Sequence, residues 1–88
     1  MTGPRVFLTG VTGFIGSHVA RILDREGCEI HALVRPGSRR DNIRDIESKI
    51  GFLEGNLTSP ESWVDAVGRI RPDICIHLAW QTTAGVYL

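Results

Sequence analysis

The chain has 88 residues, and its ten basic side chains balance its ten acidic ones, so the formal net charge at pH 7 is zero. Hydrophobic residues make up 42% of the chain and charged residues 23%, which is typical of a globular domain and argues against disordered and fibrous classes. The scattered arginines provide no basic surface for nucleic acid, and no apolar run approaches the roughly 18 residues that a membrane helix needs.

Cysteine usage and the N-terminal residues indicate the compartment. Cys28 and Cys75 lie far apart, with no further cysteine at metal-ligand spacing, so we expect neither a disulfide framework nor a metal site. Arg5 precedes apolar residues, but the glycines that follow interrupt any signal-peptide core. The sequence therefore predicts a cytoplasmic protein.

The first half of the chain predicts two strands around one helix. Residues 5–9 are β-branched and apolar and end at a glycine, as in a buried parallel strand. Residues 14–26 carry apolar side chains at helical spacing, and Gly27 supplies a left-handed stop. Residues 29–34 (EIHALV) predict the second strand, and residues 35–40 a turn-rich loop.

The second half repeats this alternation. Residues 41–49 carry Ile43 and Ile46 three positions apart, which favours a short helix, and residues 50–53 predict a third strand. A further helix is expected from the Ser-Pro-Glu start at residue 59 to residue 70, and a fourth strand over residues 73–78. The order βαβαβαβ predicts a parallel α/β sheet with right-handed crossovers and spatial strand order 3-2-1-4.

The run T-G-V-T-G-F-I-G at residues 9–16 lies between the first strand and the first helix. Such a turn can bring backbone N–H groups to a pyrophosphate at a helix N-terminus, and a purely structural turn is the alternative. Gly10 would permit the sharp turn, Gly13 would admit the pyrophosphate to the backbone, and Gly16 would allow the helix to pack closely against the strand. The pattern thus predicts the start of a Rossmann dinucleotide site.

Three other residues of this turn carry side chains whose roles differ from those of the glycines. Thr12 either caps the helix or touches phosphate, and its type suits both. Phe14 and Ile15 are expected to pack, while their backbone N–H groups face the ligand.

Arg35 ends the second strand, about 20 positions after Gly16, where a Rossmann unit reads the adenosine ribose. No acid stands there to hold the hydroxyls of NAD, whereas a guanidinium can grip a 2′-phosphate. With donors from Ser38, Arg39 and Arg40, this loop favours NADP over NAD. The alternative is a solvated loop in which Arg39 and Arg40 pair with Asp41 or Asp45.

The glycine turn, Arg35 and the segments G-N-L-T-S-P-E-S and I-H-L-A-W together resemble the extended short-chain dehydrogenase/reductase family, and more narrowly its NAD(P)-dependent nucleotide-sugar epimerases and dehydratases. The resemblance implies that Asn56 contacts adenine through its side-chain oxygen, although the family usually has Asp there. It also implies that the backbone of Leu78, Ala79 and Trp80 runs alongside the phosphate and ribose of the cofactor. Trp80 stands where the family has a small alanine. The residues expected to contact the dinucleotide are Gly10, Thr12, Gly13, Phe14, Ile15, Gly16, Arg35, Ser38, Arg39, Asn56, Leu57, Leu78, Ala79 and Trp80.

The resemblance also implies catalysis by a Tyr-x-x-x-Lys pair, which these residues do not contain. Tyr87 is the only tyrosine and Leu88 follows it, so Tyr87 is not expected to be catalytic. We therefore expect residues 1–88 to be the N-terminal part of a Rossmann domain, with the catalytic and substrate parts elsewhere. The parent would be a nucleotide-sugar epimerase, dehydratase or related reductase, compatible with a homodimer; a noncatalytic NADP-sensing module and an inactive truncated fragment are the alternatives.

Overall fold

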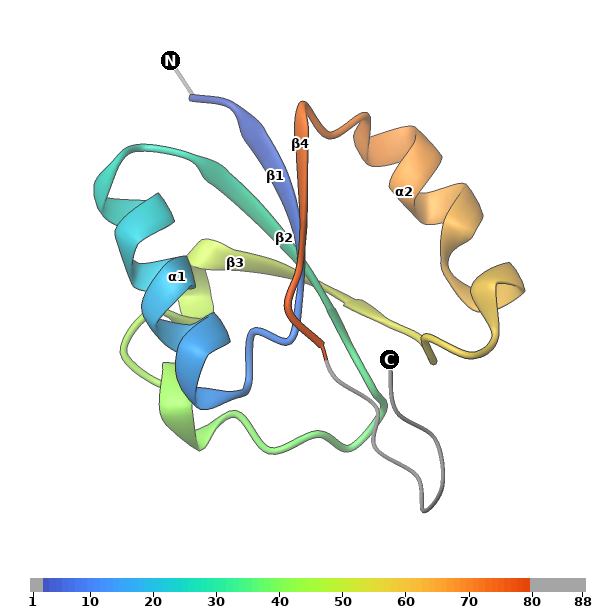
Figure 1. Ribbon diagram of the computed structural model, residues 1–88, viewed down its shortest axis with the longest axis horizontal. Helices are drawn as coiled ribbons and strands as arrows, with labels where there is room; N and C mark the ends of the chain where they lie inside the picture. The colour runs from blue at the N-terminus through green and yellow to red at the C-terminus, as the bar shows by residue number, and fades with distance from the viewer. Residues whose placement is uncertain (1–2, 80–88) are drawn as a thin grey trace.

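The structure is a computed structural model that describes residues 3–79, in which strands and helices alternate along the chain (Figure 1). The strands are β1 (Arg5–Thr9), β2 (Glu29–Val34), β3 (Ile50–Glu54) and β4 (Ile74–His77). The α-helices are α1 (Phe14–Arg25) and α2 (Val64–Ile70), and short 3₁₀ turns occupy η1 (Asp41–Ile43), η2 (Glu47–Lys49) and η3 (Pro60–Ser62).

The strands form one parallel sheet in the order β3-β2-β1-β4, which confirms the predicted Rossmann arrangement. Leu8 in β1 lies opposite both Ala32 of β2 and Ile76 of β4, so β1 is an interior strand. Figure 1 shows α1 and α2 on opposite sides of this sheet. The carboxyl ends of the four strands therefore meet at one edge, between the two helical layers.

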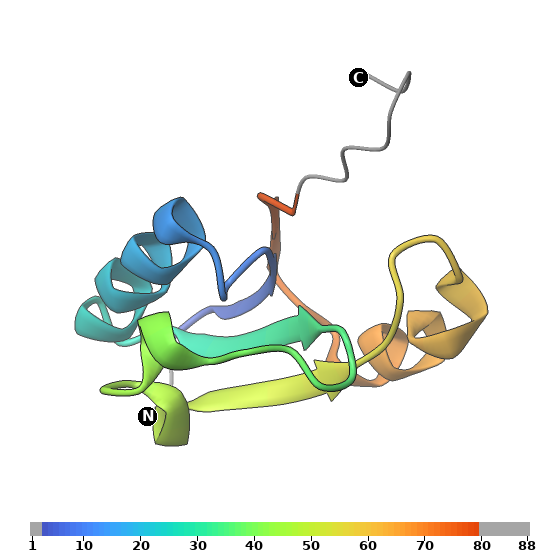
Figure 2. The ribbon, with the colours of Figure 1, turned by 90° about the horizontal axis from the view of Figure 1, so that it is seen from below.

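The core lies mainly on the α1 side of the sheet. Leu8, Ile30 and Ala32 are fully or almost fully buried there, and Ala20 of α1 and Ile43 of η1 join the same apolar cluster. Figure 2 shows the segment between β2 and β3 returning beside α1, which is how η1 reaches this cluster.

On the opposite face, the alternation along β1 points Phe7 toward η3 and α2. Its ring stacks on that of Trp63, with centroids 5.9 Å apart and planes inclined by 22°.

The helix α1 starts and stops much as its sequence predicts. Gly13 is its N-cap with an extended backbone, and the helix ends at Arg25, one residue before the predicted end. Gly27 has φ of +80°, and the N–H of Cys28 reaches back to the carbonyl of Leu23. The left-handed glycine stop is thus confirmed.

The predicted helix over residues 41–49 is wrong, because the structure has two separate 3₁₀ turns, η1 and η2. Ile43 and Ile46 are both buried, as their spacing implied. A 3₁₀ turn also places residues i and i+3 on one side, so this spacing cannot distinguish it from an α-helix. The side chains of Asn42 and Asp45 bond outside the segment, to the main chain of Thr12 and to Arg21.

The predicted helix over residues 59–70 is broken at Trp63. The 3₁₀ turn η3 precedes it, α2 follows it, and Trp63 itself has φ of −142°, outside the helical range. The Trp63 indole donates a 2.8 Å hydrogen bond to the carbonyl of Asn56 while its ring stacks on Phe7. These tertiary contacts fix Trp63 and interrupt the helix.

Candidate functional site

A cavity of about 550 Å³ opens at the carboxyl ends of β1, β2, β3 and β4, a volume within the usual range for small-molecule sites. Its walls come from the turn after β1 and the loops after β2, β3 and β4. The lining residues are Thr9, Gly10, Thr12, Gly13, Leu33, Val34, Arg35, Ser38, Gly55, Asn56, Leu57, Thr58, Leu78 and Ala79.

Most of the residues expected at a dinucleotide site line this one cavity. Those that do so are Gly10, Thr12, Gly13, Arg35, Ser38, Asn56, Leu57, Leu78 and Ala79. Gly16 and Arg39 are not in its lining, and neither are Phe14 and Ile15. Phe14 is 75% exposed and Ile15 65%, so neither packs in the core of the described chain, and the Phe14 ring meets the ring of His18 edge-on, with centroids 4.7 Å apart. Trp80 and Tyr87 lie outside the described residues.

The three glycines of the turn, Gly10, Gly13 and Gly16, have different surroundings. Gly10 has φ of +83°, and a Cβ there would lie 2.7 Å from the Ala79 nitrogen, so it permits both the turn and the approach of the β4 end. A Cβ on Gly16 would lie only 1.8 Å from the Gly10 carbonyl oxygen, so Gly16 allows helix and turn to touch. On Gly13 the nearest atom would be at 3.4 Å, an ordinary contact. Gly13 therefore leaves open space at the cavity wall.

Backbone donors gather where α1 meets the cavity. The Gly13 N–H bonds the Gly10 carbonyl at 3.1 Å, and the Ser17 N–H makes the first helical bond, to Gly13, at 2.9 Å. The N–H groups of Phe14, Ile15 and Gly16 precede that bond and lack intrahelical acceptors, which makes the helix start attractive to an anion. Gly13 is the N-cap and no side chain caps it, so the capping alternative for Thr12 is wrong.

The side chain of Thr9 connects the end of β1 to the end of β4 by hydrogen bonds, a role that the sequence did not predict. Its hydroxyl accepts hydrogen bonds from the N–H groups of Leu78, at 3.1 Å, and Ala79, at 3.2 Å. Nδ1 of His77 lies 2.7 Å from the same oxygen. The Leu78 N–H is shared with the Thr9 main-chain carbonyl, which also lies 3.1 Å away. The signal in the sequence is a threonine directly before the first glycine.

In the loop after β2, Arg35 lines the cavity, whereas Arg39 and Arg40 pair with acidic residues. The Ser38 N–H and hydroxyl both donate to the Arg35 carbonyl, at 3.0 and 2.6 Å, and Gly37 closes this turn with φ of +78°. Arg39 pairs with Asp41 at 2.7 Å, as the alternative interpretation expected. Its hydrogen bond to Asp41 holds the pKa of that carboxyl below the ordinary value.

Arg40 takes a partner that the sequence did not indicate. It lies 3.6 Å from Glu47, and its guanidinium sits 4.1 Å from the centre of the Phe52 ring. Among the ion pairs of residues 3–79, none involves Arg35. The cavity therefore has one arginine at its β2 end that is not committed to a carboxylate of the described chain.

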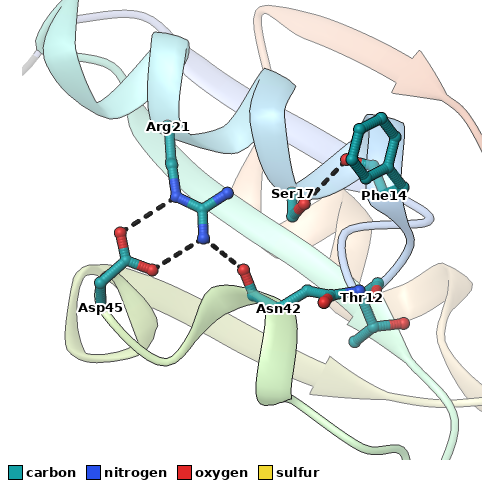
Figure 3. Close-up of polar contacts among 6 residues, drawn as sticks. All are labelled: Thr12, Phe14, Ser17, Arg21, Asn42 and Asp45. Atoms are coloured by element: carbon teal, nitrogen blue, oxygen red, sulfur yellow. Dashed lines mark hydrogen bonds and ion pairs between the residues drawn. The ribbon is translucent and has the colours of Figure 1, made fainter.

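The glycine turn is held from outside the cavity by a chain of polar contacts (Figure 3). Arg21 of α1 binds the Asp45 carboxylate with two nitrogens, at 3.0 and 2.8 Å, and also donates to the Asn42 carbonyl. The Asn42 amide in turn donates to the Thr12 carbonyl at 2.9 Å. Helix, 3₁₀ turn and glycine turn are thereby joined at a place that the ligand does not need to reach.

A sequence model described as the NAD dependent epimerase/dehydratase family matches residues 6–87. The chain belongs to this family. It is 33% identical over 82 residues to the GDP-mannose 4,6-dehydratase sdnI of Sordaria araneosa, covering 91% of this chain and 15% of that protein.

Two solved structures that contain different dinucleotides are similar to this chain. The UDP-glucose 4-epimerase of Thermus thermophilus in complex with NAD superposes with a TM-score of 0.74 at 31% identity, covering 90% of this chain and 25% of that one. The leucoanthocyanidin reductase of Vitis vinifera with NADPH gives 0.72 at 27%, covering 86% and 27%. This chain thus spans about a quarter of the length of each structure.

Residues 3–79 offer neither a metal site nor a membrane helix. No group of three or more His, Cys, Asp or Glu side chains there could hold a metal ion. None of the helices in that range has the length and apolar character needed to cross a membrane.

Proposed function

We propose that the chain binds NADP in this cavity, as the N-terminal dinucleotide-binding part of a nucleotide-sugar epimerase, dehydratase or related reductase. The observation that carries the proposal is that one cavity joins the glycine turn after β1, Arg35 after β2 and Asn56 after β3. In a Rossmann unit these places receive pyrophosphate, ribose and base in turn. Residues 1–88 would then form the first part of one Rossmann domain.

The pyrophosphate would lie against the start of α1, where free backbone N–H groups and the helix dipole favour an anion. Gly13 supports this placement, since no side chain fills the cavity wall there. Gly10 and Gly16 would act through the shape of the turn. Thr12 lines the cavity without capping the helix, which leaves its hydroxyl for phosphate.

The preference for NADP rests on Arg35. A guanidinium at this place can bind the 2′-phosphate through two parallel hydrogen bonds, and no carboxylate of the loop occupies it. Arg39 is already paired with Asp41, so Arg35 would be the principal phosphate ligand. Family neighbours carry either NAD or NADPH, so the choice in this chain depends on its own loop.

When bound, the nicotinamide would supply the hydride chemistry, and this chain would hold and orient it. The substrate would be a nucleotide sugar or a related small molecule, handled by residues beyond these 88, and the complete enzyme would form a homodimer. Cys28 and Cys75 are both free thiols, as suits a reducing compartment such as the cytoplasm.

Titration of NADPH and NADH, followed by calorimetry, tests the assignment. We expect NADPH to bind at least about tenfold more tightly, the lower end of what a hydrogen bond to a charged group contributes. Arg35→Asp should abolish or reverse this preference. Arg39→Asp, which changes charge identically in the same loop but outside the cavity lining, should retain it. Equal affinities for NADPH and NADH in the unaltered chain would show that Arg35 does not recognise the 2′-phosphate of the ribose. A preference for NADPH that Arg35→Asp leaves unchanged would show the same.

A further inference from the structure

Asn56 stands at the β3 end of the cavity with all but one of its polar groups already engaged. Its backbone N–H lies 3.3 Å from the Ser62 hydroxyl, and its carbonyl accepts from the Trp63 indole at 2.8 Å and the Ser59 N–H at 2.9 Å. Its side-chain oxygen accepts from both the N–H and the hydroxyl of Thr58, at 3.0 and 2.8 Å. The residue is therefore held firmly in one orientation.

These contacts also decide which end of the side-chain amide is free. An amide oxygen has two lone pairs, and the two donors of Thr58 use both. Rotating the amide by half a turn would set its NH2 against the Thr58 N–H, donor against donor. The NH2 is thus the remaining group, and it donates to no other residue between 3 and 79.

Given the proposed function, on which this step rests, a purine base would lie at the end of β3, where Asn56 lines the cavity. In the proposed arrangement the pyrophosphate would lie at the end of β1 and the ribose at Arg35 after β2, so the base would continue in the same direction, toward the end of β3. There the cavity wall is formed by Gly55, Asn56, Leu57 and Thr58.

The expectation that the Asn56 oxygen accepts a bond from the adenine amino group therefore does not fit the structure. We propose instead that Asn56 offers the base a hydrogen-bond donor, so that the cavity accepts a 6-oxopurine dinucleotide as readily as an adenine one. The NH2 can donate to a ring nitrogen of adenine or to the 6-oxo oxygen of hypoxanthine. A carboxylate in the same turn would keep the Thr58 bonds but offer only an acceptor, which favours the 6-amino group and repels the 6-oxo oxygen.

Calorimetric titration of the 88-residue chain with NADP+ and with nicotinamide hypoxanthine dinucleotide phosphate tests this difference. The two ligands carry identical phosphates, so the ratio of their dissociation constants removes long-range charge effects. In the unaltered chain we expect that ratio to stay within about threefold, less than one hydrogen bond to a charged group contributes. Asn56→Asp should weaken the hypoxanthine ligand relative to NADP+ by about tenfold or more.

Ser48→Asp is the matched control, because it adds the same charge at an exposed position outside the cavity lining and should leave the ratio unchanged. If the unaltered chain binds NADP+ but binds the hypoxanthine ligand more than about tenfold less tightly, the donor assignment is overturned while the proposed function stands. An unchanged ratio in Asn56→Asp also overturns it. If neither ligand binds, the proposed function fails and this inference fails with it.

Discussion

The side-chain amide of Asn42 donates a 2.9 Å hydrogen bond to the main-chain carbonyl of Thr12, joining the 3₁₀ turn η1 to the glycine turn 30 residues earlier in the chain. Arg21 fixes the other side of η1 by donating to the Asn42 carbonyl and binding Asp45 (Figure 3). Neither Asn42 nor Arg21 lines the cavity, so the shape of the glycine turn depends partly on residues that need not touch a ligand.

Asn42→Ala should loosen the glycine turn. The variant loses one exposed hydrogen bond to the Thr12 carbonyl, so we expect the free energy of unfolding to fall by about 0.5–1.5 kcal/mol and the affinity for NADP to fall with it. Urea denaturation and calorimetry measure the two effects. Asn42→Asp removes the donor and sets a carboxylate beside that carbonyl, so it should be at least as damaging. Wild-type binding in both variants would show that the contact is dispensable.

The Arg21–Asp45 pair makes stability depend on pH in the acid range. The hydrogen bond from Arg21 holds the pKa of Asp45 below its ordinary value of 3.8. A carboxyl with a lowered folded pKa stabilises the protein fully above the unfolded value, and this contribution disappears as pH falls through the folded pKa. Asp45→Asn should therefore lower stability at pH 7 and converge on the unaltered chain as pH falls below about 4.

Denaturation midpoints measured across that pH range check this behaviour. The double variant Arg21→Gln/Asp45→Asn is the control. Its Asp45 carboxylate, the titrating partner of Arg21, is already absent, so removing Arg21 as well cannot break a pH-dependent pair. The pH dependence of its stability in the acid range should therefore be nearly the same as that of Asp45→Asn alone. A single Asp45→Asn variant that kept the original slope would assign the pH dependence to other carboxyls.

Gly13 and Gly16 should respond in opposite ways to added side chains. Gly13→Val should leave the chain folded, since its Cβ makes only an ordinary contact, yet abolish dinucleotide binding by filling the cavity wall. Gly16→Ala should destabilise the fold, by about 1–3 kcal/mol, because its Cβ would overlap the Gly10 carbonyl. Far-UV circular dichroism with binding measurements separates the two. A Gly13→Val protein that still binds would contradict the placement of the pyrophosphate.

Thr9→Val should weaken the attachment of β4. The variant keeps the shape of the side chain but removes the acceptor for the Ala79 N–H and the bond to His77. The Leu78 N–H keeps its other acceptor, the Thr9 main-chain carbonyl. Leaving the Ala79 N–H unpaired typically costs about 1–3 kcal/mol, which chemical denaturation can measure. Thr9→Ser retains the hydroxyl and should lose much less. Equal losses in the two variants would assign the effect to the methyl group.

The sheet could be predicted because β1 and β2 are buried along most of their length, as their apolar runs indicate, and because the strands are bounded by glycine, proline and charged residues. The sequence could not show where residues 41–49 turn, because the Ile43–Ile46 spacing fits both α and 3₁₀ geometry. It also could not show the break at Trp63, because that break depends on a ring stacking against Phe7, more than fifty residues earlier.

The candidate site shows the same division between local and tertiary information. The sharp turn at Gly10 was predicted correctly, since its positive φ follows from the turn itself, whereas the close contact of Gly16 is with the turn at Gly10 and not with the strand. Which arginine faces the cavity was decided by acids elsewhere, Asp41 for Arg39 and Glu47 for Arg40. The free end of Asn56 was decided by Thr58, two residues on, a pairing that composition and spacing do not reveal.

The contact of Thr9 with Leu78, 69 residues apart in the chain, has a consequence for how the protein folds. The entropy of closing a loop rises with its length, so we expect this contact to form after the more local ones. The cavity consequently has no complete wall until β4 has docked beside β1. We expect a dinucleotide to recognise only the fully assembled sheet, which makes ligand-dependent protection from proteolysis a direct readout of the last step of folding.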